Sequence, residues 1–245
     1  MEEVNGDGFE CVKNILTFLT FAAFLSAFWD EQLEENDRQV LLDAEARDPD
    51  LIKKIVNHLS KKMISRERDK RSVDSILQQI NTDEMIRSIF RKDPTRQTIH
   101  EKAQIFWTIA HKYPDLKKLA ADNCGFCLSD GQLHSISKTN PRPAGSTKTM
   151  DTYSSSTDTY GYYKYTGDDG GSQDNQRKDA GHYLKEASDY VLKNPHSTTK
   201  FEACLDGKYY NEKRLSALNK LIPLEAKSRV SITSCASIIP KSGPV

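Results

Sequence analysis

The stretch FWTIAHKYPDLKKLA, residues 106–120, separates two parts of the chain that differ in character. The part before it, from Asp48 onward, shows amphipathic helix patterns with short breaks. The part after it, 124–176, is dominated by Ser, Thr, Asp, Gly and Tyr. This contrast predicts a mainly α protein: a compact bundle of short helices, a disordered linker and a small C-terminal helical region.

Apolar spacing and capping residues support the bundle, which we expect over residues 31–123. Asp48 suits an N-cap and Pro49 a first helical position, and Asn81-Thr82-Asp83 can supply the cap of a later helix. Apolar residues recur at 3–4 residue spacing, as a helix that faces a core requires. Those assigned to buried faces are Leu51, Ile52, Ile55, Val56, Leu59, Met63, Val73, Ile76, Leu77, Ile80, Met85, Ile86, Ile89, Phe90, Ile99, Ala103, Phe106, Trp107 and Ala110.

An uncharged apolar segment, ILTFLTFAAFLSAFW, occupies residues 15–29. It is shorter than the ~20 apolar residues of a membrane span. Its acidic flanks are unlike the basic start of a secretory signal. We therefore expect an apolar helix within residues 1–30, buried in a core or in a subunit contact, and no membrane partner. A membrane-associated helical protein is the alternative.

The second half of the chain contains few aliphatic residues before residue 177. We predict that 124–176 is a flexible linker, because almost no Leu, Ile or Val follows Ile136 there. The tyrosines clustered at 160–165 could be phosphorylated or stack on a partner, and a plain linker is the alternative. Helical patterns return at 177–193 and 208–222, and a short strand fits 230–233 and 237–239. We expect the end of this region, 177–245, to fray.

Charge is distributed unevenly although the net charge is zero. Residues 1–50 carry 13 acids against 3 bases, whereas residues 51–121 carry 16 bases against 8 acids. This excess predicts a basic face that binds a protein partner, another copy of the chain, or a nucleic acid; a solvated helix face is the alternative. The residues assigned to this interaction are Lys53, Lys54, Lys61, Lys62, Arg66, Arg68, Lys70 and Arg71.

The five cysteines are an odd number, and there is no N-glycosylation sequon, so we expect a cytoplasmic protein. Cys124 and Cys127 form the only two-cysteine motif and could supply two of the four ligands of a zinc site. No second ligand pair stands at a conventional spacing. Zinc at these two residues is thus half a site, with ordinary cysteines as the alternative, and no other cofactor is predicted.

Catalytic motifs are missing. There is no glycine-rich phosphate loop, no HExxH and no G-x-S-x-G. Pro114-Asp115 matches the Pro-Asp dipeptide of metal-dependent nucleases, but we find no acid-x-lysine strand downstream, and 116–118 is interpreted as helix. We therefore predict no catalytic residues and no enzymatic activity.

Residues 48–123 resemble a caspase-recruitment domain (CARD) of the death-fold superfamily. The resemblance is carried by LSKKMISRE at 59–67, MIRSIF at 85–90, and the helices of 105–120. It implies homotypic assembly through charged patches, in which the basic residues would meet acids such as Glu34, Glu35 and Asp37. The apolar segment at 15–29 is not part of the family's pattern.

These observations lead to one expected function and two alternatives. We expect a non-enzymatic adaptor with four segments, 1–30, 31–123, 124–176 and 177–245, that assembles with a protein partner or with itself. The alternatives are a basic nucleic-acid-binding protein, for example a viral one, and the membrane-associated protein.

Overall fold

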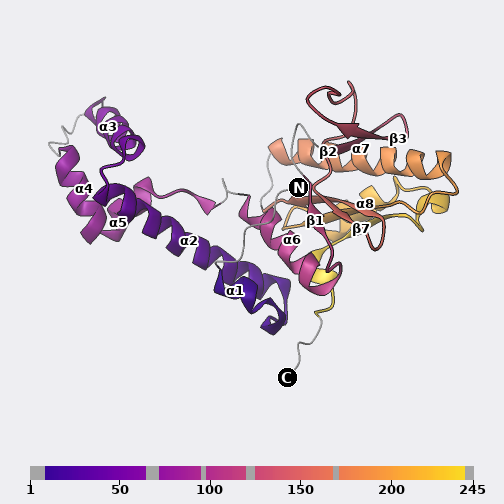
Figure 1. The fold of residues 1–245 in the computed structure, drawn as a ribbon, viewed down its shortest axis with the longest axis horizontal. Coiled ribbons are helices and arrows are strands. Elements are labelled where there is room, and N and C mark those ends of the chain that lie inside the picture. Colours follow the sequence, from indigo (N-terminus) through magenta and orange to yellow (C-terminus); the bar gives the residue numbers. More distant parts are fainter. Residues whose placement is uncertain (1–8, 65–71, 95–97, 120–124, 168–170, 241–245) are drawn as a thin grey trace. The chain divides into compact units, whose positions relative to one another are not determined.

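The computed structural model describes residues 9–64, 72–94, 98–119, 125–167 and 171–240. The chain forms two compact units. The first, here the sheet unit, combines Met1–Leu25 with His100–Val245, and the second, the helical unit, is Ser26–Ile99. Figure 1 shows both units and labels several of their elements.

The sheet unit is built on a mixed five-stranded sheet of order β1-β4-β5-β6-β7. The first three strands are antiparallel neighbours, and the last three run parallel. A parallel pair needs a crossover connection, and helices α7 and α8 lie in the two crossovers. The bounds are α6 (Ile99–His111), β1 (Lys117–Lys118), β4 (Thr152–Ser154), β5 (Thr159–Tyr165), α7 (Gly171–Lys193), β6 (Lys200–Asp206), α8 (Glu212–Asn219), η3 (Leu224–Ala226) and β7 (Val230–Thr233).

Alternation along the strands separates two faces of this sheet. In β6, Phe201, Ala203 and Leu205 join the apolar core on the α7 side. Tyr160 and Tyr162 of β5 belong to the same core. The alternate residues of β6, including Glu202 and Cys204, face α6 and its neighbours. The sheet is therefore covered on both faces, and the polar residues of β6 meet a helix rather than water.

A separate hairpin of β2 (Gly125–Ser129) and β3 (Gln132–Ile136) packs on the other side of α7, which lies between the two sheets in Figure 1. The hairpin turns at Asp130 and Gly131, with φ of 52° and 66°. Positive φ at both central residues is typical of the two-residue type I′ turn, which favours Asp-Gly.

The helical unit contains most of α2 (Phe21–Glu45), together with α3 (Pro49–Ile64), α4 (Val73–Thr82) and α5 (Glu84–Phe90). Both predicted caps are confirmed: Asp48 accepts hydrogen bonds from the amides of Asp50 and Leu51, and the Asp83 side chain caps α5. The core of this unit consists of Val40, Ala44, Leu51, Ile55, Ile76, Leu77, Ile80 and Phe90.

The prediction of a mainly α, all-helical protein is wrong. Residues 124–176, predicted to be a disordered linker, contain β2, β3, β4 and β5, and the C-terminal region contributes β6 and β7. The physical reason is that Tyr160, Tyr162 and Tyr163 are buried. Their rings supply the apolar surface that the missing Leu, Ile and Val would have provided. Of the strand predicted at 230–233 and 237–239, the first part is confirmed as β7, whereas 237–239 contains no strand and Ser237 belongs to a short 3-10 helix.

Several local predictions also need correction. Val56, Met85 and Ile89 are exposed by 45%, 76% and 45%, so they are not core residues. Lys117 and Lys118 form a strand instead of continuing a helix. The apolar segment 15–29 is broken: α1 (Glu10–Lys13) and η1 (Ile15–Thr17) precede α2, which begins at Phe21. The two compact units have other bounds than the four predicted segments. Among the described residues, no helix is long and apolar enough to cross a bilayer.

Candidate functional site

Helix α6 turns a polar stripe toward the sheet. Glu101, Gln104 and Thr108 recur at three- and four-residue spacing, and Lys112 follows directly after the helix. A period of 3.6 residues places such positions on one side of a helix. Gln104 and Thr108 are fully buried. Because buried polar groups are costly unless they are hydrogen-bonded, the partners of this stripe on the sheet define the candidate sites.

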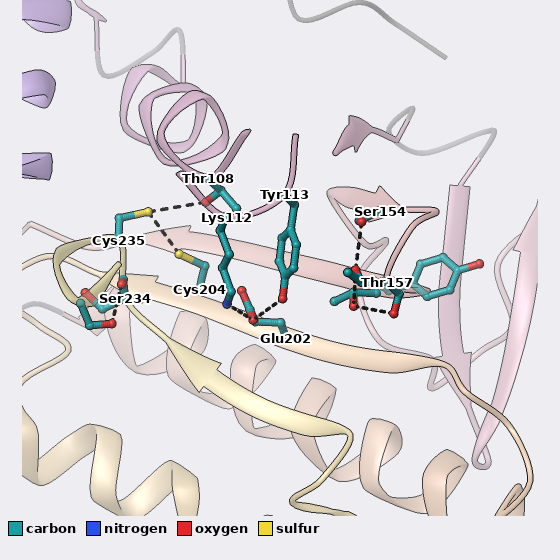
Figure 2. A network of polar contacts seen from close by, with 12 residues as sticks. Thr108, Lys112, Tyr113, Ser154, Thr157, Glu202, Cys204, Ser234 and Cys235 are labelled. Atoms are coloured by element: carbon teal, nitrogen blue, oxygen red, sulfur yellow. Dashed lines mark hydrogen bonds and ion pairs between the residues drawn. The ribbon is translucent and has the colours of Figure 1, made fainter. Parts of the chain in front are cut away.

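Four buried residues, two of which are cysteines, lie together, and we call them the sulfur cluster. They are Gln104 of α6, Cys204 and Asp206 of β6, and Cys235 of η4 (Cys235–Ser237). The Sγ atoms of the two cysteines are 3.5 Å apart, and Asp206 Oδ2 lies 3.5 Å from Cys204 Sγ. Asp206 Oδ2 also accepts hydrogen bonds from Gln104 Nε2 at 2.6 Å and from the Cys235 amide at 3.1 Å. Figure 2 shows the two thiols pointing toward each other beside Thr108.

Electrostatics keep the two cysteines as thiols. Burial raises the pKa of the Cys204 thiol well above its ordinary value, and it also raises the pKa of Cys235. Ligand atoms of Cys204, Asp206 and Cys235 all lie within 4.8 Å of one another. Within the described part of the chain, this is the one group of three or more potential metal-ligating side chains.

A buried ion pair stands next to the sulfur cluster. Glu202 accepts hydrogen bonds from Lys112 Nζ and, at 3.1 Å, from the Tyr113 hydroxyl (Figure 2). Burial opposes the charge of Lys112, but the attraction of Glu202 outweighs it and raises the lysine pKa. Burial and Glu202 raise the pKa of Tyr113 as well. Because Lys112 and Tyr113 both donate hydrogen bonds to Glu202, we interpret this as a structural ion pair.

Asp115, from the Pro-Asp dipeptide, holds the turn between β4 and β5. It accepts hydrogen bonds from the Ser156 amide at 2.7 Å and from the hydroxyls of Ser154, Ser155 and Ser156. The Ser156 amide and then the hydroxyls lower the pKa of Asp115, although burial acts in the opposite direction. The hydrogen-bonding capacity of this carboxylate is therefore used by residues of the turn.

The third polar group, the Asp151 cluster, comprises Asp151, Glu101 and Lys164. Pairing of β4 with β5 covers only Thr159–Gly161, so β5 continues beyond its partner strand. There the Asp151 Oδ2 atom accepts a hydrogen bond from the Tyr163 amide at 2.7 Å. Glu101 and Lys164 form an ion pair at 2.5 Å between Oε1 and Nζ, with side chains 27% and 25% exposed. The side chains of this cluster are therefore partly buried, and the cluster reaches water at the ion pair.

The pKa of the Asp151 carboxyl is raised far above its ordinary value. Burial raises its pKa to about 7, against the hydrogen bond from Tyr163. The charge of Glu101 raises this pKa further, while Lys164 and Lys118 lower it. A carboxyl that titrates near neutrality beside a second acid and two lysines is a candidate functional group, since such shifts concentrate at functional sites.

The residues predicted from the sequence are only partly described. Lys53 and Lys54 are exposed on α3. The side chains of Lys61, Lys62, Arg66, Arg68, Lys70 and Arg71 lie outside the described residues. Of the predicted zinc ligands, Cys124 lies outside them too, and Cys127 is fully buried in β2, opposite His134 in the hairpin register. Both the interaction surface and the Cys124–Cys127 zinc site therefore stay predictions.

Sequence reasoning missed the Asp151 cluster and the sulfur cluster. One signal was present: FEACLD at 201–206 alternates apolar and polar residues, which is typical of a strand. That alternation would have placed Cys204 and Asp206 on one sheet face. A comparison of the chain with known protein families, curated proteins and solved structures found no match.

Proposed function

We propose that the sheet unit is a metal-dependent hydrolase of nucleic-acid phosphodiester bonds and that the Asp151 cluster is its active site. This proposal replaces the non-enzymatic role expected from the sequence. The observation that carries it is the position of Asp151. This carboxyl lies directly before β4, accepts a hydrogen bond from the Tyr163 amide, and is influenced by the charges of Glu101, Lys164 and Lys118.

Two carboxyl groups near a lysine suit a divalent cation. Mg²⁺ is bound through one or two carboxylates, water and substrate phosphate oxygens. Asp151 and Glu101 would hold the ion, which would supply Lewis-acid activation of the phosphodiester and of water. With such an ion bound, Asp151 and Glu101 would repel each other less, and Asp151 would be held in its ionised form.

Lys164 has a second role in this proposal. It is paired with Glu101, and a cation on Glu101 would weaken that pairing. The ammonium group then becomes available to a phosphate oxygen, with which lysine interacts as a point charge. Lys118, whose charge lowers the pKa of Asp151, adds positive potential next to the same carboxyl. These two lysines favour an anionic substrate.

A nucleic acid is the anionic polymer that fits the rest of the chain. Residues 51–121 carry 16 bases against 8 acids, and such an excess binds phosphate backbones electrostatically. The nucleic-acid alternative drawn from the sequence thus becomes part of the proposed function.

The test is cleavage of labelled single-stranded DNA, duplex DNA and RNA with Mg²⁺ or Mn²⁺ and with a chelator. We expect metal-dependent cleavage that falls at least about 100-fold in Asp151→Asn, a variant that keeps an oxygen for the Tyr163 amide. Glu101→Gln should lose activity too. The matched controls are Asp189→Asn on α7 and Glu225→Gln on η3, both exposed and away from the cluster. Equal activity of Asp151→Asn and Asp189→Asn, or no cleavage of any substrate, would refute the proposal.

Assembly through the basic residues is a separate proposal that the exposed Lys53 and Lys54 support. Light scattering after size-exclusion chromatography at two ionic strengths, with and without nuclease, tests it. Complexes that dissolve with salt alone indicate protein contacts, and those that need nuclease indicate nucleic acid. The CARD resemblance and the cytoplasmic location also stay predictions; Cys11, Cys127, Cys204 and Cys235 are free cysteines, which is consistent with a reducing compartment.

A further inference from the structure

We propose that the sulfur cluster is a structural binding site for one zinc ion. Cys204, Cys235 and Asp206 are the three ligands from the sheet side, and the side-chain oxygen of Gln104 is the fourth. The proposal does not depend on the proposed activity, although Gln104 Nε2 also donates a hydrogen bond to the carbonyl oxygen of Lys164 at 3.4 Å.

The ligand spacing fits a tetrahedral ion. Zinc binds sulfur at about 2.3 Å and oxygen at about 2.0 Å, so ligand atoms around it stand roughly 3.3–3.8 Å apart. The Cys204 and Cys235 Sγ atoms are 3.5 Å apart, and Asp206 Oδ2 is 3.5 Å from Cys204 Sγ. Two of the three separations thus lie in the range that the ion requires, and the third, between Cys235 and Asp206, is within 4.8 Å.

Gln104 provides independent support. Its Nε2 atom points into the cluster, 2.6 Å from Asp206 Oδ2 and 3.7 Å from Cys204 Sγ. Its Oε1 atom is buried and has no hydrogen-bond partner among the described residues. A half-turn of the amide exchanges the two atoms. With a cation in the cluster, the oxygen would turn inward as a ligand. The amide nitrogen would then give up its hydrogen bond to Asp206 and take the buried position that Oε1 occupies now.

The charge balance also favours the ion. As two Zn–S bonds form, each thiol gives up its proton to solvent, so two thiolate charges cancel the charge of Zn²⁺. The net charge of the buried cluster is then still the single negative charge of Asp206. Outer hydrogen bonds orient that carboxylate, because Ser234 Oγ donates to Asp206 Oδ1 at 2.5 Å and the Cys235 amide donates to Oδ2.

The elements that meet at the cluster indicate a structural role. Its residues come from α6, β6 and η4, and all four are buried. A closed tetrahedral site without an open position stabilises the fold and does not activate water. The ion would therefore fix α6, which carries Glu101, against the parallel half of the sheet.

Metal content tests the proposal. The full chain, purified under reducing conditions from zinc-supplemented cells, should contain about one zinc per chain by elemental mass spectrometry. Cys204→Ser and Cys235→Ser should each lose it. Cys11→Ser, a buried cysteine outside the cluster, and Cys127→Ser, from the pair predicted by sequence, should keep it.

A second measurement avoids variants that fail to fold. Wild-type protein reloaded with Co²⁺ should show a thiolate-to-cobalt absorption band in the near ultraviolet and the strong visible bands of tetrahedral cobalt. Absence of both zinc and the cobalt band would overturn the proposal. It would equally be overturned if zinc stayed in Cys204→Ser and Cys235→Ser, if Cys127→Ser alone lost it, or if the resting protein contained a Cys204–Cys235 disulfide.

Discussion

Replacing Lys112 by Met removes one partner of a buried ion pair and leaves the other without a counter-charge. Glu202 is the deeper partner: its side chain is 7% exposed, against 30% for Lys112. Loss of one partner of a buried pair costs about 3–5 kcal/mol. Water can enter the position that Lys112 vacates, and Tyr113 still donates a hydrogen bond to Glu202. We therefore expect the free energy of unfolding to fall by about 2–3 kcal/mol.

The reverse change should cost less. Glu202→Gln leaves the ammonium of Lys112, which is exposed enough to turn toward water, so we expect a loss of about 1 kcal/mol. The double variant Lys112→Met/Glu202→Gln contains no unpaired buried charge. It should be more stable than Lys112→Met alone, with a coupling energy of about 2 kcal/mol in the double-mutant cycle.

Urea unfolding of the sheet unit measures this cycle. The chain has two tryptophans, and Trp29 belongs to the helical unit, so a Trp29→Phe background leaves the buried Trp107 of α6 as the reporter. If the double variant unfolds at the same urea concentration as Lys112→Met, or if the two single losses simply add, the ion pair does not contribute as argued.

Three further predictions concern single side chains. In chelator, the stability of the sheet unit should fall as pH rises from 3.8 to about 7, because the folded chain retains the proton of Asp151 over this range and the unfolded chain does not. One titrating group can change the free energy of unfolding by at most about 1.4 kcal/mol per pH unit. Asp151→Asn should flatten this part of the plot of urea midpoint against pH, and an unchanged slope would contradict the raised pKa of Asp151. Asp115→Asn should destabilise the protein by about 1 kcal/mol at neutral pH. Its deficit should shrink in acid, since the lowered pKa of Asp115 stabilises the fold only while the carboxyl is ionised. Gly207→Ala should cost more than about 2 kcal/mol, because φ is 96° and a Cβ would lie 2.2 Å from the Thr166 carbonyl oxygen. Gly145→Ala, with φ of 75° and open space around its Cβ, should cost only about 1 kcal/mol in thermal unfolding, and equal losses would show that the contact with Thr166 is unimportant.

The helical unit was predictable because its signals are local. Asp48 and Asp83 cap helices through amides two or three residues away, and capping follows from such short-range geometry. Burial within these helices was less predictable. Val56 and Met85 fit an apolar stripe but are exposed, because only packing with distant elements decides which apolar residues reach a core.

The sheet was missed because its apolar surface comes from aromatic residues. The Tyr-rich sequence at 160–165 has the composition of a linker, yet aromatic residues are enriched in strands. Asp130-Gly131 carried a readable hairpin signal as well. In this chain, turn residues and tyrosines form strands although their composition is typical of disorder.

The candidate sites could not be read from spacing. Glu101 and Lys164 are 63 positions apart, and Gln104 and Asp206 are 102 positions apart. Neither separation follows a rule of helix or strand periodicity; the contacts exist because α6 packs across the sheet. Only the fold brings these groups together, so a motif search over short windows does not find them.

Because Ser26–Ile99 is inserted between two parts of the sheet unit, the two units can complete their folding only at different times during synthesis. The helical unit consists of consecutive residues, so it can fold once Ile99 has left the ribosome. Phe24, whose ring stacks on Trp107 at 5.8 Å, must wait for α6, and Cys204 must wait for Cys235. During that interval the nascent chain presents unburied aromatic rings and unpaired strand edges beside a finished neighbour. This is the stage at which chaperones would be needed most and aggregation would compete with folding.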